Sequence, residues 1–229
     1  CLLLVLGLMI GFSVKAQAVQ AATINFDKTG YYYTRQNGDG SNRHSWFLKN
    51  YYVDGQVAYC IDPGIPEGNP MYEVGWDATG LPNSIKERVT LIAYYGYTYP
   101  EHQTLQYKAA AQGMIWSEIL GNGTTVSYST GRWGAGTQLD VSAEKAEIER
   151  LIANHYIRPS FNGSVYKLQV GETLTLTDTN GVLGDYNVSV SGADYNVNGN
   201  TLTIKPTTNG TINLTMTKKM PYSSSYKLF

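Results

Sequence analysis

The spacing of hydrophobic and polar residues predicts strands in the first part of the chain. Short aromatic or β-branched stretches alternate there with turn-forming residues such as Asn37-Gly38-Asp39-Gly40. The predicted strands cover residues 23–26, 31–34, 45–48 and 56–61. Asp62-Pro63-Gly64 closes the last of them, so we expect Cys60 near a strand end, beside a loop.

From residue 84 onward the apolar residues recur at helical spacing. Ser84-x-x-Glu87, preceded by Pro82, predicts a capping box at the start of a first helix. A second helix is predicted from about residue 104 to 120, with Gly121 as its stop. A third begins near Ser142, and we interpret His155 in its apolar stripe as a hydrogen-bonded core histidine.

Beyond Arg158-Pro159-Ser160 the composition shifts to Thr, Asn, Val and Gly, and an all-β region is predicted. Asn198-Gly199 indicates a tight hairpin. We therefore predict an α+β protein, with a mixed strand and helix domain at 19–158 and an incomplete, immunoglobulin-like β-sandwich at 159–229. The strands expected in the second domain cover residues 165–170, 173–177, 186–190, 201–205 and 211–217.

Residues 1–18 are interpreted as part of a secretory signal peptide. Cys1 to Gly11 is an apolar run too short to span a bilayer, and Ala16-Gln17-Ala18 is a small-x-small cleavage pattern. Cys1 is not interpreted as a lipoprotein cysteine, because the apolar run follows it. The mature, secreted chain would then keep one cysteine, Cys60, which is inert and buried, paired with another molecule, or reactive.

Composition argues against several classes of partner. The net charge is -1 and charged residues make up 15% of the chain, so no basic excess is present to bind nucleic acid. The three histidines are scattered and no cluster has metal-ligand spacing. We expect no cofactor, no metal and no membrane insertion of the mature domain.

One glutamine in the second predicted helix lies at a position where an apolar residue is expected. Gln112 falls in the middle of the apolar stripe, and burying an amide without partners costs about 1–3 kcal/mol. Three explanations remain open: the amide bonds to backbone in the core, it binds a ligand, or it has reacted. The stripe is formed by Leu105, Ala109, Gln112, Trp116 and Ile119.

The third explanation joins Gln112 to Cys60. A cysteine sulfur can attack a glutamine carboxamide and expel ammonia, which leaves a thioester without N–H groups to satisfy. The reaction needs the two groups held in contact in a dry pocket, because positioning lowers the barrier and water hydrolyses the product. Tyr59, Trp116 and the tyrosine-rich run 94–99 are candidate pocket walls, although ordinary packing also explains each tyrosine.

Two motifs resemble those of the thioester domains of Gram-positive surface adhesins. The first is Tyr59-Cys60-Ile61, and the second is Gln112-Gly113-Met114-Ile115-Trp116. The second motif usually reads Thr-Gln-x-Ala-Ile-Trp, so Ala111 and Met114 depart from it without touching the reactive pair. The resemblance covers about residues 22–158, and the later β region is similar, less specifically, to the stalk modules of such adhesins.

The resemblance implies a function. Cys60 and Gln112 would form an internal thioester, and a lysine of a host matrix or plasma protein would attack the Gln112 carbonyl and remain attached. Such a protein reacts once and is not an enzyme in the usual sense. It would be displayed on the cell surface, anchored to the cell wall through a region beyond residue 229. Stalk modules of the family often contain isopeptide bonds, for which Lys167 or Lys205 is a candidate, although both also fit solvated strand lysines.

Two other functions stay open at this point. In a secreted cysteine hydrolase, Cys60 would be the nucleophile and His102 or His44 the base, but such cysteines usually lie at a helix N-terminus. In a non-covalent module, Trp46, Trp76 and Trp133 would bind a glycan or a protein. Gln112 would then be an ordinary buried amide.

Overall fold

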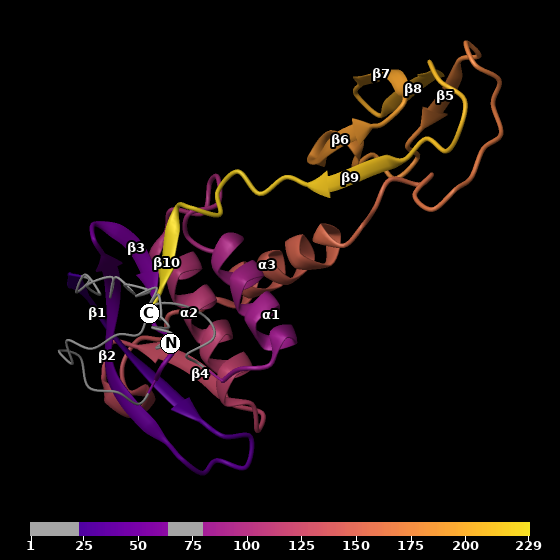
Figure 1. The fold of residues 1–229 in the computed structure, drawn as a ribbon. Helices are drawn as coiled ribbons and strands as arrows, with labels where there is room; N and C mark the ends of the chain where they lie inside the picture. The colour runs from indigo at the N-terminus through magenta and orange to yellow at the C-terminus, as the bar shows by residue number, and fades with distance from the viewer. Residues whose placement is uncertain (1–22, 64–79) are drawn as a thin grey trace, which may run out of the picture.

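A computed structural model describes residues 23–63 and 80–229 of the chain. The predicted signal peptide and Trp76 lie outside these residues. The first unit of the fold is a five-stranded sheet packed against three helices (Figure 1). The sheet order is β10-β3-β2-β1-β4, with β10 parallel to β3 and the other pairs antiparallel.

Three strands of this sheet were predicted: β1 and β2 are longer than expected, and β3 ends two residues earlier than expected. The two strands predicted at 23–26 and 31–34 are one strand, because the chain crosses a β-bulge between Lys28 and Tyr32 without leaving the sheet. Strand β4 was not predicted, although the turn-forming Gly121-Asn122-Gly123 precedes it and Gly131 follows it. The strands of this sheet are β1 (Ile24–Gln36), β2 (His44–Val53), β3 (Gln56–Tyr59), β4 (Thr125–Ser129) and β10 (Tyr226–Leu228).

The three predicted helices are present: α1 (Asn83–Tyr94), α2 (Leu105–Leu120) and α3 (Ser142–His155). The predicted capping box on α1 is wrong: the helix begins two residues earlier, at Asn83, Pro82 is its N-cap in place of Ser84, and no side chain caps it. Pro82 can take this place because its fixed φ suits a helix start. His155 is hydrogen-bonded as predicted, with its Nδ1 2.9 Å from the Tyr95 hydroxyl.

The core of the first unit lies between the sheet and the helices. It includes the fully buried Ile92, Ile115 and Ile148, one from each helix, and Tyr59 and Tyr128 from the sheet. Helix α2 is buried along most of its length, from Lys108 to Trp116. Thr104 caps its start by accepting a hydrogen bond from the N–H of Tyr107, and Gly121 ends it at φ 60°. None of the helices in the described ranges is both long and apolar enough to cross a membrane.

The second unit is all-β and lies beyond the end of α3 (Figure 1). Two sheets, ordered β5-β8-β7 and β6-β9, share a core around Phe161, Leu183 and Leu202. The hairpin at Asn198-Gly199 is confirmed, whereas no strand forms over residues 165–170. The strands are β5 (Leu174–Thr177), β6 (Tyr186–Val190), β7 (Ala193–Asn198), β8 (Thr201–Pro206) and β9 (Leu214–Lys218). The immunoglobulin-like topology stays a prediction.

The chain does not end in this second unit. After β9 it returns to the first unit, where β10 adds to the sheet beside β3 (Figure 1). Both ends of the β region therefore connect to the first unit. The domain boundary predicted at 158/159 stays a prediction, but residues 226–228 belong to the first sheet by their hydrogen bonds.

Candidate functional site

Cys60 and Gln112 lie in contact, as the sequence pattern predicts. Cys60 follows directly after β3, and Gln112 is in the middle of α2 with 2% of its surface exposed. The backbone N–H of Cys60 donates to Gln112 Oε1 at 3.0 Å, and Gln112 Nε2 donates to the carbonyl oxygen of Cys60 at 2.8 Å. The buried amide is thus satisfied by the residue whose sulfur is its predicted reaction partner.

The two hydrogen bonds form because β3 loses its neighbouring strand at this point. The last residue of β3 paired with β2 is Ala58, opposite Tyr51. Beyond it, side chains of α2 replace the strand: Lys108 Nζ donates to the carbonyl of Ala58 at 2.5 Å, and Gln112 binds the main chain of Cys60. Lys108 and Gln112, one helical turn apart on α2, thus bind the carbonyls of Ala58 and Cys60, which lie on the same side of this segment. Without these donors the two carbonyls would be left unpaired at the edge of the strand.

The other edge of the same segment is held by Phe229, which follows β10. The N–H of Phe229 donates to the carbonyl of Tyr59 at 3.0 Å, and the N–H of Ile61 donates to the carbonyl of Phe229 at 2.7 Å. The main chain of residues 58–61 is therefore bonded on both sides. This fixes the backbone of Cys60 against α2, as reaction between two side chains requires.

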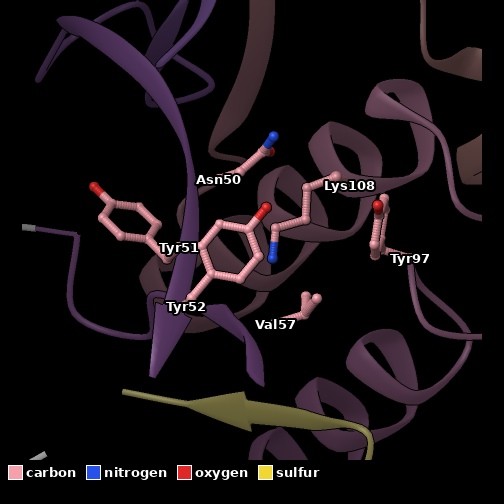
Figure 2. A pocket seen from close by; sticks show the side chains of 6 residues that line it. All are labelled: Asn50, Tyr51, Tyr52, Val57, Tyr97 and Lys108. Atoms are coloured by element: carbon pink, nitrogen blue, oxygen red, sulfur yellow. The ribbon is translucent and has the colours of Figure 1, made fainter. Parts of the chain in front are cut away.

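Lys108 is a buried amine beside the reactive pair. It is 3% exposed, and its ammonium lies 3.8 Å from the ring centroid of Tyr59. Figure 2 shows its side chain extending from the helix toward the strands that carry Tyr52 and Val57, in a small cavity also lined by Tyr97. Burial lowers the pKa of Lys108 to about 7, because the charged form loses its hydration.

Sequence reasoning did not identify Lys108. The signal was available, because Lys108 precedes Gln112 by four residues and so shares its face of α2. A lysine on a buried helix face is usually expected to extend its ammonium group to the protein surface. The hydrogen bond to Ala58 shows that it instead points into the sheet.

The aromatic residues predicted as pocket walls lie in the core around the pair. Tyr59 is fully buried, and its hydroxyl accepts a hydrogen bond from the N–H of Tyr97 at 2.8 Å. Burial raises the pKa of Tyr59 well above its ordinary value, so its hydroxyl stays protonated. Trp116 is 4% exposed and packs on Tyr33 with ring centroids 4.7 Å apart. Their role as walls of a reaction pocket stays a prediction.

The glycine after Gln112 allows α2 to approach β4. A side-chain carbon at Gly113 would lie 2.4 Å from the hydroxyl of Tyr128. That hydroxyl donates to the carbonyl of Ala109 at 2.5 Å, so it cannot move without losing a buried hydrogen bond. The close approach therefore sets the depth at which Gln112 faces β3.

We expect Gly113→Ala to lower the free energy of unfolding by about 1 kcal/mol. Overpacking costs about 1–3 kcal/mol, and the better helix propensity of alanine returns about 1 kcal/mol. Urea unfolding of the variant measures the effect. In Gly113→Ala combined with Tyr128→Phe, the clashing oxygen is gone, so alanine should be tolerated better than in the wild-type background. Equal costs in the two backgrounds would contradict the role of the Tyr128 hydroxyl.

The structure does not bring a histidine to Cys60 as a base. His102 is buried, its Nδ1 lies 2.8 Å from the carbonyl oxygen of Tyr95, and its ring stacks on Tyr107 at 3.6 Å. His44 lies on β2 opposite Arg35, with its ring against Tyr33. Both imidazoles are engaged away from Cys60, so the geometry does not support the cysteine hydrolase.

The remaining candidates lie elsewhere. Trp46 on β2 and Trp133 in the short 3-10 helix η2 (Arg132–Gly134), which contacts β1, β2 and β4, are partly exposed, at 44% and 46%. Lys167 and Lys205 are both exposed, but only Lys205 lies in a strand, opposite Asp194, as expected for a solvated strand lysine. Among the described residues no group of three or more His, Cys, Asp or Glu could hold a metal ion.

Comparison with known proteins shows a similarity to one family of domains. Residues 57–155 match the model of the thioester domain family, and both Cys60 and Gln112 fall within this range. The chain is similar in structure to the thioester domain of the Staphylococcus aureus TIE protein, with a TM-score of 0.60 and 22% sequence identity. The match covers 82% of this chain and 77% of that chain, and at this identity it shows a shared fold. No curated protein matches the chain.

Proposed function

Because residues 57–155 match the model of the thioester domain family, we propose that Cys60 and Gln112 form an internal thioester that captures a host protein covalently. The observation that carries the proposal is the pair of hydrogen bonds between the Gln112 carboxamide and the main chain of Cys60. They hold the carboxamide of one predicted reactant against the residue that bears the other.

The bond forms by acyl transfer from nitrogen to sulfur. The Cys60 sulfur attacks the Gln112 side-chain carbonyl carbon, the carbon–nitrogen bond breaks, and Nε2 leaves as ammonia with the proton of the thiol. Lys108 lies one helical turn away, and its pKa of about 7 lets it accept and return a proton near neutral pH. The departing nitrogen gives up the hydrogen bond to the Cys60 carbonyl.

The N–H of Cys60 has a second task in this scheme. It already donates to Gln112 Oε1, the oxygen that carries negative charge when the carbonyl carbon is attacked. A fixed donor at that oxygen stabilises the tetrahedral state, as in an oxyanion hole. The same donor would serve both formation of the thioester and its later opening.

Capture is the reverse exchange with an amine. A lysine amine of the target attacks the Gln112 carbonyl carbon, the carbon–sulfur bond breaks, and Cys60 leaves as a thiol after taking the proton. The product is an amide that joins the two proteins. Each molecule reacts once, so the protein acts as a covalent adhesin and not as an enzyme. The partner class we propose is a host matrix or plasma protein, met at the cell surface.

The intact mass of freshly purified protein tests the proposal. We expect a mass lower than calculated by one molecule of ammonia, and a gain of one methylamine after treatment with that amine. Methylamine should also expose one thiol that reacts with a maleimide. Cys60→Ala should show its full calculated mass and ignore methylamine. A wild-type mass equal to the calculated value, with no methylamine adduct, would contradict the thioester.

A further inference from the structure

Two tryptophans and two arginines form an alternating surface cluster away from the reactive pair. We call these residues, Arg43, Trp133, Arg132 and Trp46, the Trp–Arg platform. The guanidinium of Arg132 lies 5.3 Å from the ring centroid of Trp46 and 5.5 Å from that of Trp133. Arg43 lies 5.3 Å from the ring of Trp133. The cations and rings thus hold each other in place at the surface.

The backbone holds Trp133 in an unfavourable conformation. Its φ of 63° and ψ of 24° lie in the left-handed region, which costs a residue other than glycine about 1–3 kcal/mol. Two hydrogen bonds maintain it: the N–H of Trp133 donates to Ser45 Oγ at 3.1 Å, and its carbonyl accepts from Arg43 at 2.7 Å. Trp133 keeps nearly half of its surface exposed although its backbone conformation is unfavourable. This indicates that the indole ring has a role other than packing.

The platform is positively charged and lacks internal compensation. In the described ranges, neither Arg43 nor Arg132 forms an ion pair with a carboxylate. Arg35 adds to the charge from the neighbouring strand. The pKa of His44 between them is lowered, first by burial and then by Arg35 and Arg132. An anionic group brought here would meet guanidiniums that keep unused donors.

We propose that the Trp–Arg platform binds an anionic polysaccharide, with the indole rings stacking on sugar rings and the arginines binding sulfate or carboxylate groups. The C–H bonds on one face of a sugar ring carry partial positive charge and pack on the electron-rich face of an indole. The planar guanidinium matches an oxyanion with two parallel hydrogen bonds. The site does not need the thioester and would act as a reversible contact.

An acidic peptide fits these observations less well. A peptide commonly docks by adding a strand to an open sheet edge. Strand β4 is the sheet edge next to Arg132 and Trp133, and its outer side already pairs with residues 137–139, where the N–H of Leu139 donates to the carbonyl of Tyr128 at 2.9 Å. The Trp–Arg platform offers ring faces in place of free main-chain groups, which favours a ligand made of rings.

Titration of a size-defined heparin oligosaccharide into Cys60→Ala protein tests the inference without any covalent step. We expect reversible binding, seen as a change in tryptophan fluorescence, that weakens as salt is raised. Trp46→Ala and Arg43→Gln should each weaken binding about tenfold or more, because a few aromatic and arginine residues carry most of such binding energy. Thermal unfolding of each variant shows whether it is folded.

Controls of the same residue types lie outside the Trp–Arg platform. Tyr195→Ala removes a comparably exposed ring, and Arg158→Gln removes an exposed arginine, so neither should change heparin affinity. Equal binding of neutral dextran, tighter binding of a poly-glutamate peptide, or unchanged heparin affinity in folded Trp46→Ala and Arg43→Gln would overturn the proposal. Because the thioester is absent from the Cys60→Ala protein, none of these results depends on the covalent chemistry.

Discussion

Gln112→Glu is expected to abolish the thioester completely, leaving the protein at its full calculated mass and unreactive toward methylamine. A carboxylate is a poor acyl donor to a thiol, because its charge repels the attacking sulfur and no neutral leaving group is available. The substitution also replaces the Nε2 donor by an oxygen facing the carbonyl of Cys60. Intact mass before and after methylamine treatment measures the loss.

The matched control for this substitution is Gln103→Glu. Gln103 also donates its amide N–H groups to main-chain carbonyls, those of Tyr97 at 3.0 Å and Tyr99 at 2.6 Å, but its side chain is exposed. This variant loses similar hydrogen bonds and gains the same charge, yet it should keep the mass deficit of one ammonia. A deficit that survives in Gln112→Glu would show that another residue supplies the acyl group.

A second variant tests the thioester independently of whether Gln112→Glu folds. Cys60→Ala keeps both hydrogen bonds to Gln112, because they involve the main chain of residue 60 and not its sulfur. We therefore expect it to fold with the same contacts and still lack the thioester. Loss of the mass deficit in this folded variant assigns the chemistry to the sulfur and not to the stability of the domain.

The second large effect concerns the buried amine of Lys108. In Cys60→Ala protein, we expect the free energy of unfolding to gain about 2 kcal/mol from Lys108 between pH 7.5 and 9.0. The folded-state pKa is about 7, against 10.5 for an unperturbed lysine. Between these values the unfolded chain binds a proton that the folded chain lacks. Stability therefore rises with pH in this window and is lowest below pH 7, where burial opposes the charged form.

Lys108→Met should remove this pH-dependent gain. It also leaves the carbonyl of Ala58 without its donor, which costs about 1–3 kcal/mol at every pH. The informative quantity is therefore the slope of the free energy of unfolding against pH, and not its value at one pH. Tyrosines with raised pKa values, such as Tyr59, lower stability as pH approaches 10, but they do so equally in both proteins. Urea unfolding at several pH values gives both slopes.

Lys145→Met is the comparison for the slope measurement. Burial also lowers the pKa of Lys145, so its removal should flatten the pH dependence in the same direction. Lys145 is less buried than Lys108, and its effect should be the smaller of the two. Identical slopes for Cys60→Ala protein with and without Lys108→Met would show that the amine is not held neutral by the fold.

Local patterns led to the pairing of Cys60 with Gln112 because each residue carried its own signal, and the structure places the two in hydrogen-bond contact. Gln112 interrupted an apolar stripe, and Cys60 stood at a strand end before Asp62-Pro63-Gly64. The capping box predicted at Ser84 was wrong, because Pro82 allows the helix to begin two residues earlier, at Asn83. The strand predicted at 165–170 is absent, since alternation over six residues is a weak signal where no neighbouring strand pairs with it.

The sequence by itself determined the helices, most strands and the two residues of the proposed thioester, because these depend on periodicity and residue chemistry over short spans. Only the tertiary structure decided that β10 returns to hold the Cys60 segment, that Lys108 points into the sheet, and that two tryptophans and two arginines share one surface. Each of these joins residues far apart in the chain. Their contacts depend on how sheet and helices pack, and no local pattern encodes that packing.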